Sequence, residues 1–382
     1  MISKQRMTNH LMDIIRIDSI SKKELDVALK LKKDMEDIGA ECFFDNVGEI
    51  VGGNVGNLIV KLKGNKKDIQ PLFLSSHMDT VGPGEGIQPN IEDGIMTSDG
   101  TTVLGSDDKS GVSIIVEVLR ALKENNIPHG DIEVAFTICE EIGLLGAKHI
   151  DESLFESKYG IVLDSSTPDR LVLKCPSSDI LNIKIHGVEA HAGLCPENGI
   201  SAIQIASEAI SKMRLGRIDS ITTSNIGSIY GGLATNIIPK YIEIKAEARS
   251  HDNNLLYKQV EHMCDCFYEA AAKNEKTIDD KIVKPTVEID INRVYNKMDV
   301  SSDSKITKLV DLAVNNLNYT IKHHTSGGGC DANYFNNKGI ECVNLGTGMY
   351  ELHTVNEYLL LKEFYRSAEI VLETIQLNAK LN

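Results

Sequence analysis

The chain has 382 residues, of which 42% are apolar and 25% are charged, a composition typical of globular proteins. Its 55 acidic and 40 basic side chains give a net charge of -15, and a surface of that sign repels phosphate backbones and anionic lipid. We therefore expect neither a nucleic acid nor a membrane as partner, and the length favours two domains.

The cysteines and the N-terminal residues bear on the cellular compartment. Eight cysteines are scattered along the chain without a Cys-x-x-Cys pair. No apolar run approaches the roughly 20 residues that a membrane span needs, and residues 1–6 lead into no apolar core of a signal peptide. These features predict a cytoplasmic protein with reduced thiols.

The first part of the chain alternates between helical and strand patterns. Residues 22–38 carry apolar side chains at helical spacing, and residues 110–123 repeat that spacing. Four short apolar runs predict buried strands, at residues 57–62, 71–76, 132–138 and 159–163. Because strands that alternate with helices form mostly parallel sheets, we predict an α/β fold with helices on both faces of the sheet.

The pattern changes after Pro176, where apolar and polar residues alternate along the predicted strands. The expected elements are a strand at 181–186, a helix at 201–213, strands at 224–230 and 241–250, a helix at 254–273 and a strand at 287–291. This β-α-β-β-α-β order is the ferredoxin-like plan. We predict a ferredoxin-like α+β domain, residues 178–293, inserted whole into an α/β domain formed by residues 1–177 and 294–382.

The first pattern resumes after the insertion, with a helix at 304–317, a strand at 340–345 and a long helix that closes the chain. Thr354 and Glu357 fit a Thr-x-x-Glu capping box for that last helix. The capping box would place His353 directly before the N-terminus of the helix.

Polar residues follow several of the predicted strands in the α/β domain. They are His77 and Asp79 after 71–76, Glu140 and Glu141 after 132–138, Asp164 after 159–163, and His353 in the loop after 340–345. Ligands of open α/β sheets bind beyond the carboxyl ends of the strands, so we expect these residues to converge there. Asp107 and Asp108 precede a helix, and a role as N-cap and partner of the helix dipole explains them equally well.

Carboxylates and imidazoles without a cysteine suit a divalent ion such as Zn²⁺, Co²⁺ or Mn²⁺. The candidate ligands outnumber those that one tetrahedral ion can use, whereas two ions about 3.5–4 Å apart with a bridging carboxylate would use them. Such a pair still needs an unligated carboxylate to take a proton from the attacking water. Glu140 and Glu141 offer that spare group, and chemistry alone leaves open which of the two it is.

Four motifs, in this order and spacing, resemble the signatures of the co-catalytic di-zinc exopeptidases and deacylases: Ser-His-Met-Asp-Thr at 76–80, Gly-Ser-Asp-Asp-Lys-Ser-Gly at 105–111, Glu-Glu-Ile-Gly at 140–143, and His353. That clan includes aminoacylase, carboxypeptidase G and acetylornithine deacetylase. The resemblance spans nearly the whole chain, and its nearest branch is the peptidase T type of tripeptide aminopeptidase.

The resemblance implies a role for each residue of the site. Two zinc ions would share Asp107 as a bridge: His77, Asp107 and Asp164 hold one, and Asp107, Glu141 and His353 hold the other. Asp79 would orient His77, and Glu140 would be the general base that activates the bridging water. The resemblance also implies a cis peptide bond between Asp107 and Asp108.

The inserted domain resembles the lid and dimerisation domain of the same clan, which implies a homodimer. His191 matches the lid histidine that contacts the reacting carbonyl oxygen, commonly from the partner subunit. Asn236 and Arg249 match positions that hold the substrate backbone or carboxylate, although a surface charge explains Arg249 equally well from the residues alone. The glycine run 327–329, with Gly328 at its centre, could approach a ligand by its backbone amides.

Two departures from the peptidase T pattern argue against strict tripeptide specificity. Ser326 stands where that family has an arginine before its glycine pair, and Ser165 and Ser166 follow Asp164 where the family has glycines. Neither departure touches the expected metal ligands.

These observations predict a cytoplasmic two-zinc aminopeptidase that hydrolyses the N-terminal amide bond of small peptides. A deacylase of N-acyl amino acids is the first alternative, because both substrates present the same amide to the metals. A non-catalytic peptide-binding or metal-binding protein is the second. A serine hydrolase using Ser165 or Ser166 is the weakest, since the chain has no Gly-x-Ser-x-Gly elbow.

Overall fold

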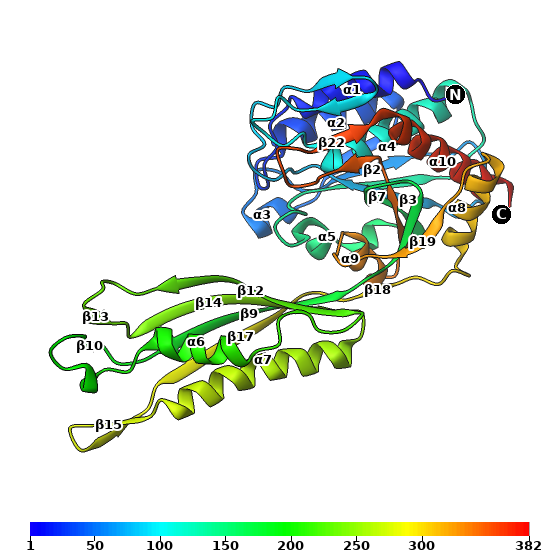
Figure 1. Cartoon of the computed structure of the whole chain (residues 1–382). Coiled ribbons are helices and arrows are strands. Elements are labelled where there is room, and N and C mark those ends of the chain that lie inside the picture. The colour runs from blue at the N-terminus through cyan, green and yellow to red at the C-terminus, as the bar shows by residue number, and fades with distance from the viewer. Residues whose placement is uncertain (382) are drawn as a thin grey trace. The chain divides into compact units, whose positions relative to one another are not determined.

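The computed structural model describes residues 1–381, and the chain divides into two compact units (Figure 1). The first unit comprises Met1–Lys174, Met298–Ser326 and the chain from Cys330 onward; the second comprises Cys175–Lys297 and Gly327–Gly329. The second unit therefore starts before, and ends after, the insertion expected at residues 178–293. The first strand of this unit begins at Ser177 and its last strand ends at Tyr295, so both are longer than their alternating apolar stretches.

A mixed sheet forms the centre of the first unit, with its strands in the order β1-β2-β6-β3-β7-β20-β8-β18 and with β19 paired to β8. The central strands β6, β3, β7 and β20 run parallel. The pairs β1–β2, β2–β6 and β20–β8 are antiparallel, and β19 pairs with β8 in parallel. The strand bounds are β1 (Glu41–Phe44), β2 (Leu58–Leu62), β3 (Leu72–His77), β6 (Ile132–Thr137), β7 (Tyr159–Ser165), β8 (Arg170–Cys175), β18 (Met298–Asp299), β19 (Lys322–Thr325) and β20 (Glu341–Gly346). The parallel centre brings the carboxyl ends of four strands to one edge.

Helices cover both faces of this sheet, as the alternation of side chains along β3 shows. Phe73 packs edge-on against Phe335 of α9, whereas Ser76, on the opposite face of the strand, donates to the carboxylate of Asp108 in α4. The helix bounds are α1 (Lys4–Ile15), α2 (Leu25–Ile38), α3 (Val47–Val51), α4 (Ser106–Glu124), α5 (Leu145–His149), α8 (Lys305–Asn316), α9 (Ala332–Asn337) and α10 (Leu361–Lys380), with a 3-10 turn at Glu152–Leu154. The α/β fold with a mostly parallel centre is confirmed.

The second unit has the predicted β-α-β-β-α-β order. Its sheet runs β11-β12-β14-β9-β17 with antiparallel pairing throughout, which is the ferredoxin-like arrangement. The main elements are β9 (Ser177–His186), α6 (Ala202–Lys212), β11 (Gly216–Arg217), β12 (Thr222–Gly231), β14 (Tyr241–Ser250), α7 (Asn253–Lys273) and β17 (Thr286–Tyr295). Short pieces complete it: β10 (Ala190–His191), a 3-10 turn (Pro196–Asn198), β13 (Ile237–Ile238), β15 (Lys276–Ile278) and β16 (Lys281–Val283).

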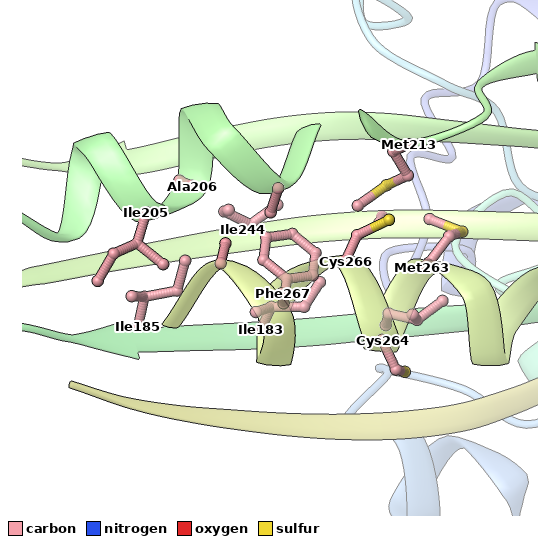
Figure 2. Close-up of a cluster of buried hydrophobic side chains, with 14 of the residues drawn as sticks. Ile183, Ile185, Ile205, Ala206, Met213, Ile244, Met263, Cys264, Cys266 and Phe267 are labelled. Carbon is pink, nitrogen blue, oxygen red and sulfur yellow. The ribbon is translucent and has the colours of Figure 1, made fainter. Parts of the chain in front are cut away.

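The core of the second unit lies between its two long helices and one face of its sheet (Figure 2). Ile183 and Ile185 of β9 and Ile244 of β14 are buried there against Phe267 of α7 and Ile205 of α6. The residues between them on the strands, such as Lys184 and Glu243, are exposed. The alternation of apolar and polar residues thus correctly predicts a sheet covered on one face.

The capping box predicted for the last helix is wrong. The helix α10 begins only at Leu361, and the strand β22 (Tyr358–Leu360) separates it from Thr354. This strand belongs to a small sheet, β21-β22-β5-β4, with β21 (Met349–Tyr350), β5 (Ile95–Thr97) and β4 (Asn90–Glu92). The carboxylate of Glu357 bonds to another part of the chain instead of capping the helix. Among the helices within residues 1–381, none has the length and apolar character needed to cross a membrane.

Candidate metal centre and active site

Residues of metal-binding type meet at the carboxyl edge of the parallel strands in the first unit. His77 ends β3, Asp164 lies near the end of β7, Glu140 and Glu141 follow β6, Asp107 opens α4, and His353 lies between β21 and β22. These segments are far apart in sequence, and the parallel pairing of the strands brings them together as expected for an open α/β sheet. The peptide bond between Asp107 and Asp108 is cis, as the resemblance implied.

Two groups of side chains among the described residues 1–381 have donor atoms close enough to hold a metal ion: His77, Asp107 and Asp164, and Asp107, Glu141 and His353. Within each group the donor atoms lie within 4.8 Å of one another. Asp107 belongs to both groups, and each of its oxygens faces a different histidine. Its Oδ1 lies 3.2 Å from Nε2 of His77, and its Oδ2 lies 3.1 Å from Nε2 of His353.

The donor set fits two divalent ions. Each group combines one imidazole with carboxylates, which suits Zn²⁺, Co²⁺ or Mn²⁺. The Oε1 atom of Glu141 is buried and has no hydrogen-bond partner within residues 1–381, although buried carboxylate oxygens normally have one. Its other oxygen, Oε2, lies 3.0 Å from Nε2 of His353. A cation in this group would supply the missing partner.

The pKa values of the clustered carboxylates differ from those of ordinary side chains. Burial raises the pKa of Glu140, Glu141 and Asp164, and neighbouring carboxylates add to the effect. Burial also acts to raise the pKa of Asp107, but hydrogen bonds from His353 and His77 outweigh it and the pKa falls below its ordinary value. Hydrogen bonds to Asp107 and Glu141 raise the pKa of His353 to about 10. So many like charges in one buried site favour the binding of cations.

The Asp79 side chain contacts the backbone of the glutamate pair more closely than it contacts the histidine. The Nδ1 atom of His77 lies 2.9 Å from the backbone oxygen of Asp79 and 3.5 Å from its carboxylate. That carboxylate accepts hydrogen bonds from the backbone N–H groups of Glu140 (3.0 Å) and Glu141 (3.2 Å) and from Ser21 Oγ (2.6 Å). With Nδ1 donating to the carbonyl, Nε2 is the ring nitrogen that faces Asp107, and it is the atom that could bind a metal ion after losing its proton.

Two buried carboxylates that support the site, Glu24 and Asp331, are not predicted by any pattern in the sequence. Glu24 accepts the backbone N–H of Cys139 at 3.0 Å, which fixes a residue of positive φ (+54°) directly before Glu140. Asp331 accepts from Thr137 at 2.5 Å, and burial raises the pKa of Asp331 to about 6. Neither residue belongs to a local motif with its partner, so spacing along the chain contains no signal for these contacts.

His191 and Asn236 lie side by side in the second unit. The strands β10 and β13 pair there, and the backbone N–H of Ala192 donates to the backbone oxygen of Asn236 at 2.9 Å. Nδ1 of His191 accepts from the backbone N–H groups of Gly193 and Leu194, both at 3.2 Å. The proton of the neutral ring therefore sits on Nε2, where the exposed imidazole can donate to a ligand.

Arg249 and the glycine run also belong to the second unit. Arg249 lies on β14 and donates from Nη2 to Glu247 at 2.9 Å, while its buried Nε lacks a hydrogen-bond partner among residues 1–381. A Cβ atom on Gly329 would lie 2.3 Å from the ring of Tyr295, so glycine is required at that position. Gly328 is half-buried in the same run.

Several known peptidases are similar to this chain, and in some of them the similarity extends over its whole length. The family model described as peptidase family M20/M25/M40 matches residues 73–377. The solved aminopeptidase PepT from Bacillus cereus is 40% identical over 99% of each chain with a TM-score of 0.89, and a solved tripeptidase from Staphylococcus aureus is 36% identical over 100% of each chain with a TM-score of 0.93. Peptidase T from Fusobacterium nucleatum is 26% identical over 94% of this chain and 91% of its own length. The chain therefore belongs to the peptidase family M20/M25/M40.

Proposed function

We propose that this peptidase is a two-metal aminopeptidase that hydrolyses the N-terminal amide bond of small peptides. The observation that carries the proposal is Asp107, whose two oxygens each face a histidine of a separate ligand group. The similarity to an aminopeptidase and to a tripeptidase supports the choice of substrate.

The chain would hold two divalent ions, with zinc as the first choice and cobalt or manganese as alternatives. His77, Asp107 and Asp164 would bind one ion, and Asp107, Glu141 and His353 the other. Bound ions of this kind polarise a carbonyl group and lower the pKa of a water molecule. Glu140 belongs to neither group, and its buried carboxylate with a raised pKa suits a general base that takes a proton from water and passes it to the leaving amine.

The second unit would bind the peptide. We assign to Nε2 of His191 a hydrogen bond to the oxyanion of the tetrahedral intermediate, because Nδ1 is occupied as an acceptor. Asn236, Arg249 and the backbone of Gly328 would hold the rest of the substrate. The same unit would serve as the lid and as the contact of a homodimer, and we place the protein in the cytoplasm.

Product analysis on a substrate panel tests the proposal. Tripeptides, dipeptides and N-acyl amino acids are incubated with the protein, with and without a chelator. We expect release of the free N-terminal amino acid from peptides, loss of activity with the chelator, and recovery on addition of Zn²⁺, Co²⁺ or Mn²⁺.

Three other results would each support a rival function. Turnover of N-acyl amino acids alone would identify a deacylase. Peptide binding by metal-loaded protein without any cleavage would identify a binding protein. Activity that survives the chelator would favour a serine hydrolase.

A further inference from the structure

The carboxylate of Glu357 binds the segment that leads into the bridging aspartate. Its Oε2 accepts from the backbone N–H groups of Leu104 and Gly105, both at 2.8 Å. Its Oε1 accepts from Ser106 Oγ at 2.6 Å and from the backbone N–H of Asp107 at 3.1 Å. Glu357 is 2% exposed, so four donors converge on one buried carboxylate. Both oxygens are used in these bonds, and neither is available as a metal ligand.

Glu357 also belongs to the turn that carries the second histidine. The backbone N–H of Glu357 donates to the backbone oxygen of Thr354 at 3.1 Å, and β22 begins at the next residue. His353 itself has a positive φ of +62°, and its side chain is 54% exposed. By contrast, His77 and Asp164 lie on β3 and β7, neighbouring strands of the central sheet. The Glu357 carboxylate is thus a direct link between the segments of His353 and Asp107.

We propose that Glu357 is a positioning residue that sets the separation of Asp107 and His353. It thereby controls the affinity of the ion held by Asp107, Glu141 and His353. The inference rests on the proposed function only in taking these side chains as metal ligands. The ion held by His77, Asp107 and Asp164 depends less on Glu357, because two of its three ligands are fixed by the central sheet.

The substitution Glu357→Gln separates positioning from packing, because glutamine has nearly the same shape. One of the two acceptor oxygens becomes an NH₂ group, which cannot accept a hydrogen bond. If the NH₂ group replaces Oε2, the backbone N–H groups of Leu104 and Gly105 face a donor. If it replaces Oε1, the backbone N–H of Asp107 faces a donor, whereas the Ser106 hydroxyl can turn and accept. Changes to groups that orient metal ligands typically weaken metal binding about 10–100-fold.

The matched control is Glu133→Gln. Glu133 is also a buried carboxylate of the first unit, and it accepts from the backbone N–H groups of Glu156 and Ser157 and from Ser157 Oγ. It lies near the start of β6, whereas Glu140 follows the end of that strand. Its loss should disturb the fold to a similar degree without touching the metal ligands.

The experiment is a calorimetric titration of metal-free protein with Zn²⁺ alone, in the presence of a competing chelator of known affinity. In wild type we expect two binding steps. In Glu357→Gln one step should weaken about 10–100-fold, while the other stays within about threefold; in Glu133→Gln both should stay within about threefold.

Equal weakening of both steps, unchanged binding, or the same loss in Glu133→Gln would overturn the inference. If Glu357→Gln does not fold, Ser106→Ala decides, because it removes one of the four donors and should weaken the same step by a smaller factor; unchanged binding in that variant would overturn the inference. A wild type that binds two ions but cleaves no peptide would refute the proposed function and leave this inference intact.

Discussion

The Asp107 carboxylate belongs to both ligand groups of the candidate metal centre. His77 and His353 approach different oxygens of Asp107, as expected for a carboxylate that bridges two ions. Each histidine also has a further carboxylate within reach, Asp164 in one group and Glu141 in the other. The arrangement is therefore that of two ligand groups joined by one residue.

Replacement of Glu140 by Gln tests the assignment of the general base. Loss of a general base typically lowers the rate about 10²–10⁴-fold, and Glu140 belongs to neither ligand group. We expect kcat on a tripeptide to fall by that factor while the protein retains two ions per chain by elemental analysis. Glu141→Gln is the control, because it should reduce the metal content as well. Ordinary turnover by Glu140→Gln would rule out the role of Glu140 as base.

At the scale of elements, a buried ionic cluster joins three helices of the first unit. Asp34 of α2 lies 3.0 Å from Nε2 of His10 in α1 and 3.2 Å from Nη2 of Arg120 in α4, and it accepts from Lys30 at 2.5 Å. Burial alone would raise the pKa of Asp34, but the hydrogen bonds from His10 and Lys30 outweigh it and lower the pKa to about 2. A depressed carboxyl pKa contributes stability that is present above the ordinary value and is lost as the pH falls toward 2.

Asp34→Asn should therefore be less stable than wild type at pH 7, and the difference should shrink between about pH 4 and pH 2. Urea denaturation at a series of pH values measures this. Asp37→Asn, an exposed aspartate of the same helix, is the control and should follow wild type throughout. A difference between Asp34→Asn and wild type that is constant with pH would show that the carboxylate charge of Asp34 does not stabilise the fold.

Phe267 and Tyr268 are neighbours on α7 with opposite environments. Phe267 is fully buried in the core of the second unit (Figure 2), whereas Tyr268 is 49% exposed. Phe267→Ala should destabilise this unit by about 3–5 kcal/mol, and Tyr268→Ala should change its stability by less than about 0.5 kcal/mol. Denaturant unfolding measures both. The proposed metal ligands all belong to the first unit, so a loss of metal from folded Phe267→Ala would contradict their assignment.

The start of α10 shows that a local sequence pattern can predict the wrong structure. Thr354 and Glu357 have the spacing of a capping box, but Glu357 finds four donors in residues 104–107, and the chain forms a short strand before α10 begins. A capping box is recognised from four consecutive residues, whereas the contact with Leu104 spans 253 positions. No local rule could have chosen between these two partners.

For the whole molecule, the sequence predicts the features that repeat along the chain and misses those that depend on distant contacts. Apolar periodicity places the central strands and the inserted β-α-β-β-α-β order, because each element must bury one face. Because the central strands are predicted to be parallel, their carboxyl ends meet at one edge of the sheet. This predicts that His77, Asp164 and Glu141 converge at that edge. The positions of Glu24 and Asp331 do not follow, since their partners Cys139 and Thr137 lie more than a hundred residues away.

Removal of the metal should destabilise the whole protein, and more so at high pH. The candidate ligands Glu141 and Asp164 have pKa values that burial raises in the metal-free fold. A raised carboxyl pKa contributes stability that is complete below the ordinary value near 4 and is lost as the pH rises through the folded-state value. Metal-free protein must therefore become less stable as these buried groups ionise. Bound cations reverse this cost, because metal ligands bind in their deprotonated form.

Each ion present at 100 times its Kd should add about 2.7 kcal/mol to the free energy of unfolding. We accordingly expect a chelator to lower the Tm, and the difference in Tm between loaded and metal-free protein to widen from pH 5.5 to pH 8. Thermal unfolding of matched samples with Zn²⁺ or with chelator measures both effects, and a magnesium-loaded sample controls for ionic strength. A Tm that the chelator leaves unchanged, or a difference that narrows as the pH rises, would contradict the view that these carboxylates form a cation site.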